Sequence, residues 1–226
     1  KEVHAYGGVV IHDVATMHHA EIAISQGVDG IILVCAGAGG LGGTLNPFAF
    51  INEARRVYDG TIVLAGAMST GRDILAAQMM GADMCILGTS FIACAEANTD
   101  QRYRDMLIAC EANDIIFTPY FTGAHCNWMK PSLVEMGIDP SDPKLLQKRQ
   151  IEEGNIKRYT DVLCAGQGVG AIRAIEPASV IIDRLIEQYS AAAAERLPRT
   201  GRYATPERES VTTRSRQRRS RSGLRA

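Results

Sequence analysis

Residues 31–48 read IILVCAGAGGLGGTLNPF, an apolar run that passes directly into five glycines between Gly37 and Gly43. The uninterrupted run is typical of a parallel strand that is buried on both faces. Glycine loses much conformational freedom on folding, so this density indicates that something approaches the backbone closely. The stretch therefore predicts a buried strand followed by a loop that accommodates a close neighbour.

The same strand-and-helix pattern recurs on both sides of this stretch. Apolar runs at residues 9–14, 31–37, 61–67 and 84–91 alternate with helix-like segments at residues 16–26, 47–58 and 69–80. Gly27 and Gly81 follow two of these segments, where glycine commonly supplies a left-handed C-cap. The alternation predicts four βα units with parallel strands. Two architectures fit such units: half of a (β/α)8 barrel, or an open doubly wound sheet.

Dinucleotide binding in a Rossmann fold is disfavoured by the context of the glycines. Gly37, Gly39 and Gly42 keep the GxGxxG spacing, but they follow the second strand of the pattern. An acidic residue is expected about 20 residues later, at the end of the next strand. At that place this chain has AGAM. The glycine loop therefore indicates a different ligand.

Three loops that follow predicted strands are rich in glycine and small residues: Gly37–Gly43, Ala65–Gly71 and Leu87–Ser90. In parallel α/β folds the carboxyl ends of the strands face the active site. Backbone N–H groups in such loops, together with the N-terminus of the next helix, favour an anion. Because the last two loops follow consecutive strands, they predict a phosphate site.

Beyond residue 98 the strand-and-helix pattern stops. We expect an amphipathic helix at 101–113, an irregular aromatic segment at 114–131, a polar helical segment at 140–159, a glycine-rich turn at 164–172 and a long helix at 178–197. Residues 195–226 hold ten arginines, three glutamates and few apolar residues, so we expect a disordered basic tail. Such a tail has nonspecific affinity for polyanions, and no specific nucleic-acid partner is expected.

The amino-acid composition further limits the class of protein. With 46% apolar and 22% charged residues, the chain resembles an ordinary folded protein. Its six cysteines are scattered without a CxxC pair, which favours reduced, mostly buried thiols over zinc ligation. The sequence shows neither a membrane-spanning apolar run nor a signal segment at its start, so we expect a cytoplasmic protein without membrane association.

Several of these segments together resemble the nitronate monooxygenases, FMN-dependent barrels that oxidise alkyl nitronates with molecular oxygen. The resemblance runs from Val9 to Leu197 and includes the glycine loop, AGAMSTG, LGTSFIACAEA, FTGAHCNWMKP and AGQGVGAI. It implies a partial (β/α)8 TIM barrel, in which residues 1–98 form the last four βα units with the FMN phosphate loops. Residues 99–194 would be a helical and aromatic-loop extension that closes the site, and the arginine-rich tail lies outside the resemblance.

The resemblance also implies which residues hold the cofactor. From the Ala65–Gly71 loop, Gly66, Ala67 and Met68 would meet the FMN phosphate, and Leu87, Gly88 and Thr89 would meet it from the Leu87–Ser90 loop. Gly39 and Gly40 would let the backbone lie against the flavin, and Gln167 would lie near the flavin edge.

The chain departs from the family pattern at one catalytic position. The family's glycine loop normally reads AGGH, whereas this chain has Gly39-Gly40-Leu41. Leucine cannot accept a proton, so the usual base is replaced. The expected substitute is His12, oriented by Asp13, and His125 in the aromatic segment is the other histidine considered.

These observations predict an FMN-dependent oxidoreductase whose small-molecule substrate is nitronate-like and is oxidised with O2. Two alternatives stay open: an FMN-dependent enoyl reductase of the same barrel type, and a flavin- or phosphate-binding protein without turnover. Four parallel strands leave two open edges and an exposed apolar face. We therefore expect the chain to associate with another chain or to be a piece of a longer protein that supplies an N-terminal half.

Overall fold

A computed structural model describes residues 1–148 and 156–195 of the chain. Lys1–Ala194 form one compact unit. The predicted basic tail, apart from Glu195, and residues 149–155 of the predicted polar helix lie outside the described residues. Among the helices that are described, none is both long enough and apolar enough to cross a bilayer.

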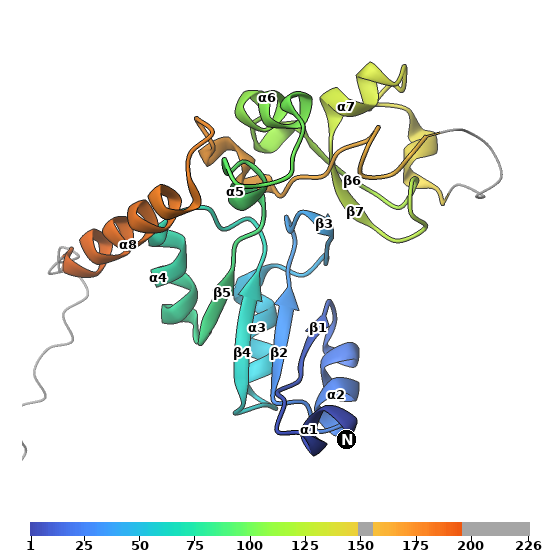
Figure 1. Ribbon diagram of the computed structural model, residues 1–226. Coiled ribbons are helices and arrows are strands. Elements are labelled where there is room, and N and C mark those ends of the chain that lie inside the picture. The colour runs from blue at the N-terminus through green and yellow to red at the C-terminus, as the bar shows by residue number, and fades with distance from the viewer. Residues whose placement is uncertain (149–155, 196–226) are drawn as a thin grey trace, which may run out of the picture. The chain divides into compact units, whose positions relative to one another are not determined.

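The predicted parallel sheet is present (Figure 1). Its strands are β1 (Ile11–Val14), β2 (Gly30–Val34), β4 (Thr61–Ala65) and β5 (Met84–Ile86). They lie side by side in the order β1-β2-β4-β5, and each neighbouring pair is parallel. The strand order therefore follows the chain order, as in successive βα units.

Three helices cover one face of this sheet: α2 (Met17–Ser25), α3 (Pro47–Arg55) and α4 (Gly71–Met80). Each helix begins at a capping residue: the side chains of Thr16, Asn46 and Thr70 each accept a backbone N–H of the first turn. As predicted, Gly27 and Gly81 have positive φ angles of 77° and 109° after α2 and α4. Local signals therefore set the beginnings and ends of these elements.

Alternation along the strands separates the two faces of the sheet. Ile31 and Leu33 of β2 and Ile62 and Leu64 of β4 belong to the core beneath the helices. The residues between them point to the opposite face, which we call the inner face. Because all three helices lie on one face, this sheet does not have the doubly wound arrangement, which places helices on both faces.

The inner face is partly exposed. Ile11, Met84 and Ile86 keep 40%, 48% and 44% of their accessible surface. Ile11 and Met84 belong to β1 and β5, which are the edge strands of the sheet. Exposed apolar side chains beside an unpaired edge are typical of a surface that another element covers.

An ion-pair network holds the amino ends of the central strands. The Arg55 guanidinium lies 2.6 Å from an Asp83 carboxylate oxygen and donates to the carbonyls of Gly60 and Gly81. Asp83 also accepts the Ile62 backbone N–H at 2.8 Å. This backbone hydrogen bond, with the guanidinium beside it, lowers the pKa of the Asp83 carboxyl.

This network predicts an acid-dependent loss of stability. A lowered folded-state pKa means that Asp83 stabilises the fold above its unfolded pKa of about 4, and that this contribution is lost as the pH falls through the folded value. We expect Asp83→Asn to cost about 1 kcal/mol at pH 7, because the carboxylate is half exposed. In urea titrations between pH 7 and pH 3, the gap between wild type and variant should close below pH 4. A gap independent of pH, or the same behaviour in the exposed control Asp59→Asn, would contradict this assignment.

A second sheet replaces the irregular segment expected at 114–131. Its strands are β3 (Gly40–Leu41), β6 (Ile115–Thr118) and β7 (Cys126–Met129), in the antiparallel order β3-β7-β6. All four residues of β7 are buried. The expectation of irregular structure was wrong because β7 is a central strand whose two faces are both covered, so its sequence shows no polar alternation.

The remaining elements connect and cover these sheets. They are α1 (Glu2–Ala5), α5 (Thr89–Ile92), α6 (Gln101–Ala109), η1 (Ala112–Asp114), α7 (Lys130–Glu135), η2 (Pro143–Leu146), η3 (Gln167–Ala171) and α8 (Ala178–Ala194). Within the predicted polar helix at 140–159, the described residues form only the short turn η2.

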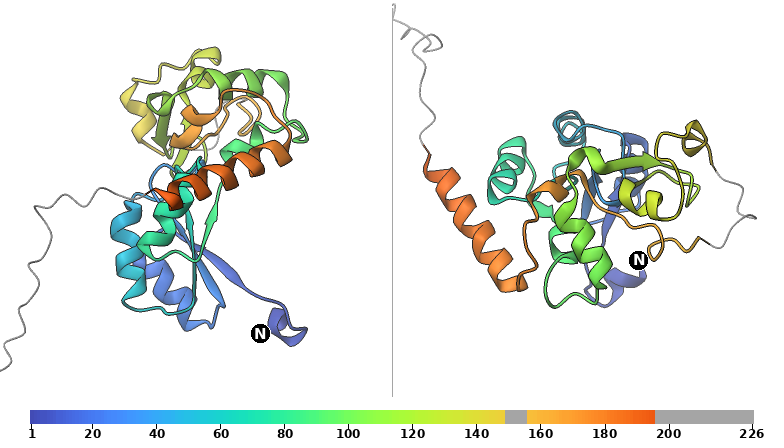
Figure 2. Two further views of the ribbon diagram at one scale, coloured as in Figure 1. Left: turned by 90° about the vertical axis from the view of Figure 1, so that its left-hand side faces the viewer. Right: turned by 90° about the horizontal axis from the view of Figure 1, so that it is seen from above.

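Helix α8 packs against α4, as the views in Figure 2 show. The Gln188 side chain accepts the Gly71 N–H at 2.9 Å, and the Tyr189 hydroxyl donates to Gln78 at 2.6 Å. These contacts join residues 1–98 to residues 99–194 within one compact unit. All six cysteines are free thiols, and all but Cys85 are buried, which confirms the expected burial.

Candidate functional site

A cavity of about 380 Å³ lies at the carboxyl ends of the parallel strands. Its floor is the inner face of the sheet, represented by Asp13, Ile32, Val34, Ala65 and Ile86. The three loops singled out in the sequence, together with residues 164–168, supply its walls. The cavity therefore occupies the place where parallel α/β proteins bind their ligands.

The glycine loop is packed closely by another part of the same chain. A Cβ atom at position 39 would lie 2.7 Å from the Gly166 nitrogen, which real Cβ atoms do not tolerate. The Gln167 N–H donates to the Gly37 carbonyl at 2.9 Å, and Asn127 Nδ2 donates to the Ala38 carbonyl at 2.7 Å. The close approach that the glycine density predicted is therefore made, at Gly39, by the 164–168 segment of the same chain.

Gly40 behaves differently from Gly39. Its φ is +70°, and a Cβ atom there would meet nothing within 4 Å. Gly40 and Leu41 form β3, which pairs with Asn127 and Cys126 of β7. Both residues line the cavity, so the loop continues as a short wall strand with open space beside it.

The loop after β4 carries backbone strain and unpaired donors. Ala67 has a φ of +56°, a left-handed conformation that costs a non-glycine residue about 1 kcal/mol or more. Ser69 Oγ donates to the Gly168 carbonyl at 2.8 Å and holds the loop against the 164–168 segment. The backbone N–H groups of Ala67 and Met68 donate to no other residue in the described part of the chain. They are therefore available to an anion in the cavity.

The loop after β5 offers a similar surface. The Gly88 N–H has no acceptor among residues 1–148 and 156–195, and a Cβ atom at Gly88 would meet nothing within 4 Å. The Thr89 hydroxyl accepts the Gly166 N–H at 3.0 Å, which fixes the 164–168 segment over the cavity. The two adjacent loops thus present three unpaired backbone donors at one end of the cavity.

Most residues expected to hold the cofactor line this cavity, namely Gly39, Gly40, Gly66, Ala67, Met68, Gly88 and Thr89. Two do not. The Leu87 side chain packs instead with Ile181 and Leu185 of α8. Gln167 is exposed, and it is its neighbours Gly166 and Gly168 that line the cavity.

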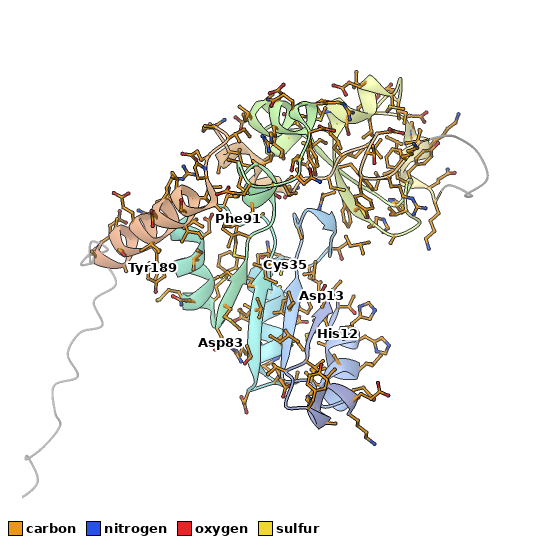
Figure 3. The ribbon with its side chains drawn as sticks, viewed as in Figure 1. His12, Asp13, Cys35, Asp83, Phe91 and Tyr189 are labelled. Carbon is orange, nitrogen blue, oxygen red and sulfur yellow. The ribbon has the colours of Figure 1, made fainter. Side chains whose placement is uncertain are left out.

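The histidine candidates lie away from the cavity. His12 pairs in register with Ile31, whose side chain belongs to the core beneath the helices, so His12 points to the helix face. Asp13, the next residue of β1 (Figure 3), is exposed, pairs with Ile32 and lines the cavity. The exposed ring of His125 stacks on Phe117 at 4.9 Å, and His125 does not line the cavity. His12 is therefore not among the groups that face the cavity, where the base was expected.

Two tyrosines and a cysteine complete the cavity lining. Tyr103 donates its hydroxyl to the Cys164 carbonyl, and burial raises the pKa of Tyr103. Burial also raises the pKa of Tyr159 and raises that of the Cys164 thiol to about 12. These groups ordinarily titrate above pH 8 and their shifts are upward, so all three are neutral near pH 7.

Sequence reasoning missed Tyr103, Tyr159 and Cys164, and it gave Asp13 only a supporting role. The sequence did contain a signal for Asp13. Val14 is apolar and is expected to face the core, and adjacent residues of a strand point to opposite faces, so Asp13 is expected to face away from that core. No local signal identifies the other three, since they reach the cavity from segments that lie 60 or more residues after the glycine loop.

Comparison with known proteins agrees with the resemblance seen in the sequence. A family model described as nitronate monooxygenase matches residues 1–188. A nitronate monooxygenase of Paraburkholderia phytofirmans is 31% identical over 129 residues, which cover 53% of this chain and 35% of that protein. A putative monooxygenase of Mycobacterium tuberculosis is 23% identical over 206 residues, which cover 84% of this chain and 55% of that protein. The chain spans about half or less of the length of these relatives.

Solved structures share the fold. FabK from Thermotoga maritima superposes with a TM-score of 0.68 at 21% identity, over 85% of this chain and 64% of FabK. A nitroalkane oxidase from Streptomyces ansochromogenes gives 0.67 at 22% identity, over 84% of this chain and 60% of that protein. These similarities confirm the predicted α/β fold with a parallel sheet.

Proposed function

The chain belongs to the nitronate monooxygenase family, and on this premise we propose that it is part of an FMN-dependent oxidoreductase that oxidises alkyl nitronates with molecular oxygen. The cavity at the carboxyl ends of β2, β4 and β5 is the observation that carries the proposal. Its two adjacent loops leave backbone donors unpaired, as a phosphate group requires.

The described residues fit FMN at both ends of that ligand. The N–H groups of Ala67, Met68 and Gly88 suit the phosphate, and the open space at Gly88 leaves room for it. The open side of Gly40 suits a flat ring beside the wall strand. In this proposal residues 1–98 hold the phosphate and residues 99–194 close the site, chiefly through the 164–168 segment.

The chemistry divides between cofactor and protein. Bound FMN supplies the capacity to accept electrons from the substrate, and O2 completes the oxidation. The protein's share is to hold the phosphate through its loops, to pack the glycine loop behind the ring and to shield the cavity with Tyr103 and Tyr159. Leu41 lines the cavity but can neither accept nor donate a proton, so any base must come from another residue.

A paired titration tests the cofactor proposal. FMN and riboflavin, which lacks the phosphate, are titrated separately into the 226-residue chain while the quenching of flavin fluorescence is followed. We expect saturable FMN binding in the micromolar range and riboflavin binding at least about 100-fold weaker, because the phosphate gains more than one charge-assisted hydrogen bond and each contributes about 1.5–3 kcal/mol. Equal affinities would contradict the phosphate site, and no binding of either ligand would contradict the proposal for this chain.

The second candidate is a flavin-binding protein without turnover, and Leu41 is the observation that favours it. The enoyl reductase alternative differs in needing reduced nicotinamide. Both are distinguished in one spectroscopic experiment with the FMN-loaded chain. Bleaching of the flavin by a nitronate supports the leading proposal, and bleaching by NAD(P)H alone supports the reductase. If neither compound bleaches the flavin, the result supports the binding protein without turnover.

The partner proposal follows from the exposed inner face. We propose that further βα units, from another chain or from a longer parent protein, cover Ile11, Met84 and Ile86 and pair with the edges of β1 and β5. The sheet would then become part of a closed (β/α)8 barrel.

A further inference from the structure

A second cavity lies beside the candidate functional site and shares a wall with it. Its volume is about 390 Å³. Tyr103 and Tyr159 line this second cavity and also line the first one. The remaining lining of the second cavity consists of Asn98, Thr99, Asp100, Thr160 and Leu163. The two tyrosines therefore stand between the cavities, and we call them the partition.

The two cavities differ in chemistry. The floor of the first is apolar at Ile32, Val34 and Ile86, whereas hydroxyl, amide and carboxyl groups line most of the second. The exposed amide of Asn98 makes no hydrogen bond within residues 1–148 and 156–195. The carboxylate of Asp100 opposes an anion in the second cavity. This cavity therefore suits a neutral polar group such as a hydroxyl.

The two members of the partition are held differently. Tyr103 donates its hydroxyl to the Cys164 carbonyl and packs against a buried hydrophobic cluster. The Tyr159 ring packs on Trp128, with centroids 5.4 Å apart, and 55% of Tyr159 stays exposed. Tyr103 is consequently bound into the core, whereas the Tyr159 ring can be removed with little loss of buried surface.

The backbone at Tyr159 is strained and held in place. Its φ is +65°, a left-handed conformation that is unfavourable for a residue with a side chain. The Arg102 guanidinium donates to the carbonyls of Thr160 and Asp161 at 3.0 Å and 2.8 Å, and it pairs with Glu135 at 2.6 Å. Strain of this kind persists only where surrounding contacts enforce it, and it gathers at ligand sites. The contacts of Arg102 therefore fix the turn that carries the Tyr159 ring into the partition.

We propose that Tyr159 is a specificity-determining residue, whose ring closes the first cavity toward the second and so restricts substrates to short-chain nitronates. At about 380 Å³ the first cavity is small for a ligand site, and in the proposed function it holds part of the flavin as well. Without the ring, a chain of about six carbons would extend into the second cavity, where a terminal hydroxyl meets the Asn98 amide. This inference rests on the proposed function, because it names the substrates of the same cavity.

Tyr159→Gly is the informative variant. It removes the ring, and glycine adopts a φ of +65° without strain, so the turn is expected to keep its shape. Tyr159→Phe is the matched control, since it keeps the ring and loses only the hydroxyl. Circular dichroism and urea unfolding of both variants establish that they fold like wild type.

The first assay needs no flavin. Trp128 is the single tryptophan of the chain and lies beside Tyr159, so its fluorescence is followed while 1-nitrohexane or 6-nitrohexan-1-ol is titrated into the 226-residue chain. We expect Tyr159→Gly to bind the hydroxylated probe about 5-fold more tightly than 1-nitrohexane, the gain of one net hydrogen bond. Wild type and Tyr159→Phe should show no such preference. Adding Asn98→Leu to Tyr159→Gly should abolish it.

The second assay uses the FMN-loaded chain and measures oxygen consumption with nitronates of two and six carbons. The ratio of kcat/KM for the longer nitronate to that for the shorter one should rise at least about 10-fold in Tyr159→Gly and stay unchanged in Tyr159→Phe.

The two assays separate this inference from the proposed function. If Tyr159→Gly gains the preference for the hydroxylated probe but no variant oxidises a nitronate, the partition stands and the proposed function fails. If nitronates are oxidised but Tyr159→Gly gains no such preference, the inference is overturned although the proposed function stands. An unchanged ratio of kcat/KM in an active Tyr159→Gly variant overturns the inference as well.

Discussion

Replacing Trp128 by alanine is expected to destabilise the chain by about 4 kcal/mol, which is a large share of the stability of an ordinary domain. Trp128 lies in the central strand β7, and its exposed fraction is 0%. Its ring contacts Phe121 and Tyr159, with centroids 5.3 Å and 5.4 Å away. Alanine would leave a cavity between these rings that the strand cannot close. Urea unfolding followed by circular dichroism measures the loss.

Trp128→Phe is the matched control. The indole nitrogen of Trp128 is buried and has no hydrogen-bond partner in the described structure. Phenylalanine removes this unpaired donor while it keeps an aromatic ring, so we expect a cost of about 1 kcal/mol. A phenylalanine variant as unstable as the alanine variant would show that the indole makes a contact not accounted for by packing.

The second large effect is expected at Gly88. Gly88→Glu should weaken FMN binding about 100-fold, because a carboxylate a few ångströms from the phosphate opposes it by roughly 1–4 kcal/mol, depending on solvent screening. The backbone tolerates the change, since φ is −99° and a Cβ atom meets nothing within 4 Å. Fluorescence titration with FMN measures the affinity.

Gly88→Gln separates charge from size, because glutamine has the same shape without the charge. We expect it to weaken FMN binding less than 10-fold. Riboflavin affinity should be the same in both variants, since riboflavin has no phosphate to repel. If the glutamate and glutamine variants bind FMN equally well, the phosphate does not lie beside Gly88.

The parallel sheet and its helices could be predicted because their signals are local. The run at 31–34 is apolar enough to mark a buried strand, Thr16 and Thr70 cap the following helices, and Gly27 and Gly81 end them. The second sheet could not be predicted in this way. β3 is two residues of a glycine loop, and it becomes a strand only because Gly40 and Leu41 meet β7, more than 80 residues later.

By itself the sequence determined the βα units, the three small-residue loops and the family of the chain, because each depends on residue type and short-range spacing. The tertiary structure decided which of those residues share a cavity. The pairing of β1 with β2 put Asp13 on the cavity side and His12 on the helix side. The close packing of Gly39 against Gly166 explains why position 39 of the glycine loop is a glycine. Register and long-range packing are properties of pairs of distant segments, and no single segment carries them.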